Sequence, residues 1–282
     1  MRELEELPVW RRRSYLAGDG YGQFLYKYRA TEAGDADSVA KLKEIVLGSL
    51  LWLSAPSDFN DPFDMKVNFI AEGGPQKKKD RIRRLVAQQG TRLTRSERRA
   101  KKVELLQMPR ARLLDGARAA YNIARQEIGV CSFASDARSI LMWSHYGNNH
   151  RGLCLQFDIA RDPASLLFAV RVDYLDEDEY PKINWYVDLQ PQLREALLRK
   201  HVGWKYEGER RIVLPNGAHS QILFRPEALR SVILGSRASP DLVDCVREIV
   251  RERASRNMPK ICVLRAREDG SRYALRIFLE RA

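Results

Sequence analysis

The chain has 282 residues, of which 44% are hydrophobic and 30% are charged, a composition typical of a water-soluble globular protein. Its length allows one large domain or two small ones with a buried core. No apolar run reaches the roughly 18 to 20 residues that a membrane-spanning helix requires. The charged N-terminus also lacks the apolar stretch of a secretion signal. We therefore expect a cytoplasmic protein with no membrane partner.

The positive charge of the chain is concentrated in one segment. The formal net charge is +12, and residues 77–102 contain twelve basic and two acidic side chains, so this segment alone carries +10. Such a concentration attracts polyanions and contacts phosphates independently of base sequence. The alternative is a solvated pair of helices with no partner. The candidate nucleic-acid-binding residues are Lys77, Lys78, Lys79, Arg81, Arg83, Arg84, Arg98 and Arg99.

The four cysteines are widely spaced and include no C-x-x-C pair. No histidine lies at zinc-finger spacing from any of them, so we expect no metal site. Cys131 and Cys154 lie in apolar, strand-like contexts, which predicts buried free thiols.

The first quarter of the chain alternates between strand and helix patterns. Residues 1–23 are expected to form a lead-in, with a short charged helix and a glycine-rich turn at residues 18–22. Aromatic residues at 24–29 predict a strand. Asp37 or Ser38 can cap the next helix, whose apolar positions follow the 3.6-residue period. A second strand is predicted at 49–54, followed by a turn-rich loop to residue 64.

Residues 76–126 have a helical pattern that is broken near Gly90 and Pro109. This basic, helical segment interrupts strand-rich regions, as an inserted lobe would. The elements that follow are strands at 129–133, 153–157, 168–174, 210–214, 221–224, 229–234, 261–266 and 273–279, and helices at 136–143, 191–201 and 239–253. A turn at residues 215–217 predicts that strand 221–224 pairs back on strand 210–214. We therefore predict an α+β fold: a largely antiparallel mixed sheet with flanking helices and a basic helical insertion, all in one domain over residues 24–282.

Residues 140–158 combine titratable side chains with large apolar ones. His145 and His150 lie close to Trp143 and Tyr146 in the sequence. This mixture is typical of a site wall, where burial shifts a pKa and aromatic rings stack on a planar ligand. The alternative is a helix end followed by a hairpin, with His145 bonded to the backbone.

Several blocks of sequence resemble the bacterial domain-of-unknown-function family 2971. They are residues 25–29, 51–64, 140–146, 150–155, 204–211 and 232–237, in the same order as in that family. The resemblance covers roughly residues 24–240, and it implies no activity because none is assigned to the family.

The chain also resembles the ADP-ribosyltransferase superfamily in its arginine–serine–glutamate form. Arg29 ends the first predicted strand, Ser54 ends the second, and Glu207 and Glu209 form an E-x-E before a later strand. The resemblance departs at Ser54, which is followed by Ala-Pro-Ser rather than Thr-Ser.

This resemblance implies NAD as cofactor and a macromolecular acceptor, with each residue in a defined role. Arg29 would hold the pyrophosphate by forked hydrogen bonds. Glu209 would stabilise positive charge on the ribose, and Ser54 would hold Glu209. Glu207 would orient or deprotonate the acceptor, with Trp143 or Tyr146 stacked on nicotinamide and His145 in the same cleft. Equally, Glu207 and Glu209 could form salt bridges on one face of a strand.

Two other functions remain open. The protein could be a non-catalytic nucleic-acid-binding protein that uses residues 77–102, or a nuclease or other hydrolase with His145 and His150 as acid and base. The chain contains no G-x-G-x-x-G, P-loop, H-E-x-x-H or G-x-S-x-G motif, so the common nucleotide-binding, metalloprotease and hydrolase signatures are absent.

Overall fold

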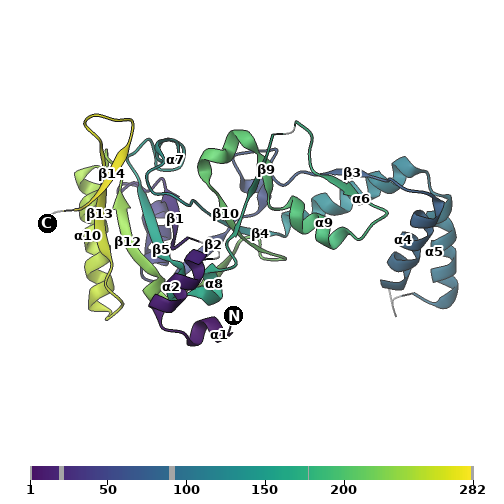
Figure 1. Ribbon diagram of the computed structural model, residues 1–282, viewed down its shortest axis with the longest axis horizontal. Coiled ribbons are helices and arrows are strands. Elements are labelled where there is room, and N and C mark those ends of the chain that lie inside the picture. The colour runs from purple at the N-terminus through teal and green to yellow at the C-terminus, as the bar shows by residue number, and fades with distance from the viewer. Residues whose placement is uncertain (1, 19–21, 89–92, 177, 281–282) are drawn as a thin grey trace. The chain divides into compact units, whose positions relative to one another are not determined.

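The computed structural model describes residues 2–18, 22–88, 93–176 and 178–280 (Figure 1). The chain forms two compact units. Unit 1 comprises Met1–Ser54, Gly129–Val172 and Gly203–Ala282, and unit 2 comprises Ala55–Ile128 and Asp173–Val202. The expected lead-in lies in unit 1, and the expected helical insertion lies in unit 2.

Unit 1 is built on a five-stranded sheet with the strand order β1-β5-β12-β13-β14. All neighbouring strands are antiparallel except β12 and β13, so the predicted α+β fold with a largely antiparallel sheet is confirmed. The strands are β1 (Phe24–Arg29), β5 (Leu153–Asp158), β12 (Leu229–Leu234), β13 (Cys262–Glu268) and β14 (Leu275–Leu279).

Helix α10 (Pro240–Ser255) makes the parallel pair of β12 and β13 possible, because parallel strands require a crossover connection. Ser239 caps the helix by accepting a hydrogen bond from the Leu242 amide, and Pro240 occupies the first turn. Leu242, Val246 and Ile249 are buried in the main core cluster of unit 1. The predicted helix at 239–253 is therefore confirmed.

Shorter strands of unit 1 form two further sheets. One has the order β4-β10-β6, and the other pairs β11 with β2. Single bridges also connect Tyr26 of β1 to Ala134, which follows β4, and Ser54, which follows β2, to Val130 of β4. The strands are β2 (Leu50–Leu53), β4 (Gly129–Phe133), β6 (Val170–Arg171), β10 (Arg210–Leu214) and β11 (Ser220–Leu223).

The predicted hairpin around residues 215–217 is wrong. The chain does turn there, with Asn216 at a φ of 54°, but β11 pairs with β2 and not with β10. The His219 amide donates to the Leu53 carbonyl at 2.9 Å, which directs the chain to the earlier strand. The turn itself was predicted correctly from local residues, but β2, which is distant in the sequence, is the strand that pairs with β11.

The N-terminal residues form helices that pack in unit 1. In α2 (Val9–Gly18), Leu16 is 1% exposed, and the Arg13 guanidinium binds the Asp158 carboxylate at 2.5 Å. Residues 19–21 of the expected glycine-rich turn lie outside the described residues. The cap of α3 (Ala36–Val46) is Asp35, two residues before Asp37 and three before Ser38, so both predicted caps are wrong. Unit 1 also contains α1 (Arg2–Glu6), α7 (Ile140–His145), α8 (Pro163–Leu166) and the 3₁₀ turns η3 (Ile159–Arg161) and η5 (Pro226–Ala228).

Unit 2 contains the predicted helical segment and two small parallel strand pairs. The segment is confirmed as three helices, and Pro109 precedes the third, while the break expected at Gly90 lies outside the described residues. These are α4 (Pro75–Gln88), α5 (Arg95–Gln107) and α6 (Arg110–Gln126). The remaining elements are η1 (Pro56–Asp58), β3 (Asn68–Ile70) paired with β8 (Lys182–Asn184), β7 (Asp173–Leu175) paired with β9 (Arg199–His201), and α9 (Leu189–Ala196).

The strand predicted at 168–174 is divided between the units. Its first part is β6 in unit 1, and its second part is β7 in unit 2, because the chain passes from one unit to the other after Val172. None of the described helices has the length and apolar character needed to cross a membrane.

Candidate functional site

The basic segment forms a helical hairpin, which we call the basic hairpin (α4 and α5). The two helices contact each other and lie side by side in Figure 1. Helix α4 buries Ile82 and Val86 on one face. Helix α5 starts at a capping box, in which Thr94 accepts from the Glu97 amide at 3.3 Å and Glu97 accepts from the Thr94 amide at 2.7 Å. Local sequence signals therefore account for both helices, and they involve few of the basic side chains.

Two of the predicted nucleic-acid-binding residues hold the hairpin together instead of facing solvent. The Lys78 ammonium donates to the carbonyls of Leu106 and Met108, at 2.9 and 3.0 Å, where α5 ends. Arg81 is 6% exposed, and its guanidinium lies over the Trp185 ring at 5.7 Å. Burial lowers the pKa of Arg81, and the nearby Arg84 lowers it further. Both cations therefore make contacts within unit 2.

Most of the other cations of the basic hairpin are exposed, whereas Lys101 and Lys102 are half-buried. Arg83 lies 3.7 Å from Asp80, and Arg84 donates weakly to the Tyr186 carbonyl at 3.4 Å. The hairpin's carboxylates are all engaged locally: Asp80 also binds Gln76, Glu97 caps its own helix, and Glu104 binds Lys101 at 3.0 Å. The exposed cations of the two helices are Lys77, Lys79, Arg83, Arg84, Arg95, Arg98 and Arg99. The described part of the hairpin thus presents seven cations with little local neutralisation.

Two adjacent lysines provide a matched test of this assignment. We expect Lys78→Gln to lower the free energy of unfolding by about 1–2 kcal/mol, because it removes a charged donor from two carbonyls at a helix end. Lys79→Gln removes the same charge from an exposed position, so its effect on stability should be within about 0.5 kcal/mol. Chemical denaturation of both variants measures the difference. Equal stabilities would contradict the structural role of Lys78.

A second polar cluster lies in unit 1, where α7 meets the end of η4 (Val202–Glu207). The Tyr146 hydroxyl donates to the Glu207 carboxylate at 2.6 Å, and Glu207 is 5% exposed. The alternative in which Glu207 and Glu209 share one face of a strand is wrong, because β10 begins at Arg210. Gly208 has a φ of +50°, and a Cβ added there would lie 2.2 Å from the Ser135 hydroxyl oxygen. This left-handed glycine separates the 3₁₀ turn from β10, so the two glutamates do not share one strand face.

Glu209 forms a buried two-point salt bridge with Arg211. The Arg211 Nε and Nη2 donate to the two carboxylate oxygens at 2.7 and 2.8 Å. The side chains are 0% exposed for Arg211 and 6% exposed for Glu209. The predicted alternative of a salt bridge is thus present, and the Glu209 carboxylate is held in a fixed orientation.

Aromatic side chains extend this cluster. The ring of His145 lies 5.7 Å from that of Tyr206, which in turn lies 6.0 Å from that of Trp204. His145 is exposed, and the other two are half-buried. Sequence reasoning assigned no role to Trp204 or Tyr206, although both belong to one of the blocks that carry the family resemblance.

Trp143 belongs to the buried core cluster against which Tyr146 and Tyr206 pack, and His150 contacts it. Trp143 is 0% exposed, its indole donates to the Ala137 carbonyl at 2.8 Å, and its ring stacks on that of His150 at 6.3 Å. Asn148, Asn149 and His150 have φ values of 49°, 51° and 67°, a left-handed turn that brings His150 back over α7.

The His150 Nε2 atom lies 3.3 Å from the Ser144 hydroxyl oxygen. Burial lowers the pKa of His150, and the positive charge of Arg237 lowers it further, which favours the neutral form of the ring. His150 bonds Ser144 and stacks on Trp143, whereas His145 contacts Tyr206. Among the contacts of the described residues, none joins the two histidines.

Arg29 and Ser54 do not join the cluster around Glu207. Tyr26 and Tyr28 of β1 pack with Trp143 and Tyr146, and successive side chains of a strand point to opposite faces. Arg29 therefore lies on the other face with Leu25, where burial lowers its pKa. Ser54 pairs through its backbone with Val130. The structure thus brings together His145, Tyr146 and Glu207 but leaves Arg29 on the opposite face of its strand.

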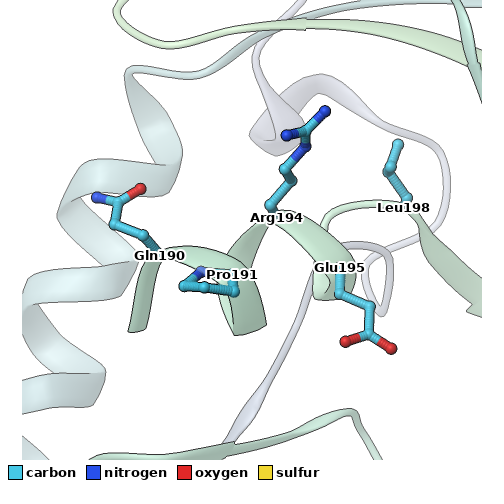
Figure 2. A pocket seen from close by; sticks show the side chains of 5 residues that line it. All are labelled: Gln190, Pro191, Arg194, Glu195 and Leu198. Atoms are coloured by element: carbon cyan, nitrogen blue, oxygen red, sulfur yellow. The ribbon is translucent and has the colours of Figure 1, made fainter. Parts of the chain in front are cut away.

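Unit 2 has an open hollow of about 570 Å³ along α9 (Figure 2). It is lined by Gln190, Pro191, Arg194, Glu195 and Leu198, and Glu195 also forms a salt bridge with Arg199. None of the predicted site residues lines it. Within the described ranges, no group of three His, Cys, Asp or Glu side chains is arranged to hold a metal ion. Cys131 and Cys154 are free and buried, as predicted.

These features define an α+β protein that has a mostly antiparallel five-stranded sheet in one unit and a basic helical hairpin in the other. A family model described as "Protein of unknown function (DUF2971)" matches residues 142–212. The chain is similar to that family over a range that includes Trp143, Tyr146, Glu207, Glu209 and Arg211. This supports the first resemblance, whereas the ADP-ribosyltransferase resemblance finds no support in the comparisons. No curated protein and no solved structure matches the chain.

Proposed function

We propose that this protein binds nucleic acid through the basic hairpin. The observation that carries the proposal is the set of seven exposed cations on α4 and α5, whose neighbouring carboxylates are engaged in caps and local pairs. Exposed Lys and Arg side chains release counterions from a phosphate backbone when they bind it, which supplies most of the non-specific affinity. Alternating signs of charge along a helix face are typical of a solvent-exposed helix, whereas residues 77–102 carry a net charge of +10.

The test measures affinity as a function of salt for wild type and the variant Lys79→Gln/Arg83→Gln/Arg84→Gln. Fluorescence anisotropy with a labelled nucleic acid of mixed sequence gives the dissociation constant at each salt concentration. Each lost phosphate contact should lower the slope of log affinity against log salt by about 0.9 on a duplex, so we expect a fall of about 2 to 3 for this variant.

A charge-matched control separates a local interface from net charge. Lys41→Gln/Arg251→Gln/Arg272→Gln removes three exposed cations from unit 1, and its salt slope should equal that of wild type. Absence of binding by wild type at low salt, or equal weakening by both variants, would refute the proposal.

A second candidate is an NAD-dependent, ADP-ribosyltransferase-like activity on a macromolecular acceptor. One contact favours it: Tyr146 and Glu207, both proposed for that site, are joined at 2.6 Å beside the exposed His145. We expect nicotinamide release by wild type and a loss of release in Glu207→Gln and Tyr146→Phe, which nearly preserve side-chain shape. Release should be measured with and without DNA and RNA. No release under any of these conditions would discard this candidate.

A further inference from the structure

The arrangement of charge on the basic hairpin identifies the form of nucleic acid that it fits, an inference that rests on the proposed function. We infer that the hairpin binds the sugar–phosphate backbone of a double helix, independently of base sequence. Three properties of the hairpin carry this inference: its lack of aromatic residues, the placement of its cations in two rows, and the small number of its base-reading side chains.

The hairpin has no aromatic side chain on which an unpaired base could stack. The sequence from Pro75 to Gln107 contains no Phe, Trp or Tyr. The nearest aromatic residues that contact it, Trp185 and Tyr186, are 6% and 8% exposed and form part of its hydrophobic base. Proteins that hold single strands use exposed aromatic platforms, which are worth about 1–3 kcal/mol per base. The hairpin therefore lacks the main element of single-strand recognition.

The cations of α4 form two rows separated by a carboxylate. Because an α-helix turns through about 100° per residue, Lys79 and Arg83 lie on one flank of the exposed face. Lys77 and Arg84 lie on the other flank, and Asp80 is between the rows. A double helix has two rows of phosphates, one on each side of a groove, and these match the two rows of cations. A single strand has only one row of phosphates.

The dimensions and the polarity of the exposed face agree with contact at the groove edges. A helix with its side chains is about 10–12 Å across, close to the roughly 12 Å width of the DNA major groove. Asp80, in the middle of the face, is repelled by phosphates and is not one of the donors that read G or A edges. Gln76, which could read adenine, is bonded to Asp80. The face is therefore suited to the two phosphate rows and not to the bases.

The experiment compares the wild-type protein on matched nucleic acids by fluorescence anisotropy. The probes are two duplex DNAs of unrelated sequence, a duplex RNA, and the corresponding single strands, all of one length and at one salt concentration. We expect at least one duplex type to bind about tenfold or more tightly than its own single strands, with the two DNA sequences within about threefold of each other. Comparing the DNA and RNA duplexes then identifies the preferred helix.

Two double variants test the rows separately. Lys79→Gln/Arg83→Gln and Lys77→Gln/Arg84→Gln should each reduce the duplex preference to below about threefold, because either change leaves only one row of cations on α4. Binding to single strands as tight as to duplexes, or affinities for the two DNA sequences that differ by tenfold, would overturn this inference and leave the proposed function intact. No binding to any probe would refute both.

Discussion

Replacing Arg211 with Met should lower the free energy of unfolding by about 3–5 kcal/mol. The substitution leaves the Glu209 carboxylate, which is 6% exposed, without the two donors at 2.7 and 2.8 Å that compensate its burial. A buried carboxylate that loses its partner is left with a large desolvation penalty, whereas the Coulomb attraction that offset the penalty is gone. Denaturant unfolding, followed by fluorescence, measures the change.

Two further variants show whether burial is the cause. Arg118→Met makes the same substitution in an exposed pair, where Arg118 and Asp115 lie 2.8 Å apart with side chains 49% and 68% exposed. Its effect should be below about 1 kcal/mol. The double variant Glu209→Met/Arg211→Met should recover much of the loss, because it removes both charges from the interior. If Arg211→Met lowered the free energy of unfolding by less than about 1 kcal/mol, the burial of the Glu209–Arg211 salt bridge would be contradicted.

This expectation also affects how Glu209 is tested for activity. Glu209→Gln leaves Arg211 buried beside a neutral amide, so a loss of any activity in that variant could come from unfolding. Glu207→Gln is a second probe, which nearly preserves the shape of a side chain that accepts from the Tyr146 hydroxyl.

Replacing Trp143 with Ala should lower the free energy of unfolding by about 3–5 kcal/mol. Trp143 is 0% exposed and contacts Tyr28 edge to face at 5.1 Å, in addition to its stacking on His150. Removal of the indole creates a large cavity and releases the left-handed turn that ends at His150. Denaturant unfolding of Trp143→Ala and of the less disruptive Trp143→Phe measures the effect.

The control for Trp143 is a tryptophan outside the core. Trp10 is 64% exposed, so Trp10→Ala should change the stability by no more than about 1 kcal/mol. If Trp143 served only to stack on a planar ligand, Trp143→Ala would weaken ligand binding and leave the free energy of unfolding unchanged. Such a result would contradict the packing role assigned to it.

Local patterns in the sequence identified most elements of the fold. The helices of residues 76–126, the capped helix after Ser239 and the strand that ends at Arg29 follow from periodicity, caps and aromatic content. These signals depend on interactions between residues close in sequence. The pairing of β11 with β2 could not be predicted, because residues 50 and 223 are brought together only by the folded chain.

For the candidate sites, too, the sequence predicted local properties but not long-range contacts. Composition alone predicted a basic surface, because the net charge of a segment does not depend on how it folds. Only the tertiary structure separated Lys78 and Arg81, which make contacts within unit 2, from the exposed Lys79 and Arg83 next to them. The E-x-E motif was visible in the sequence. Glu207 accepts from the Tyr146 hydroxyl and Glu209 accepts from Arg211, and the left-handed Gly208 between them excludes a common strand.

The sequence by itself determined the fold class, the positions of most helices and strands, and the excess of positive charge at residues 77–102. The tertiary structure decided which charges face solvent, which strands pair, and on which face of β1 Arg29 lies. The physical reason is that periodicity and composition report interactions within a few residues along the chain. Burial and partner choice are set by segments far apart in sequence, whose contacts exist only once the chain has folded.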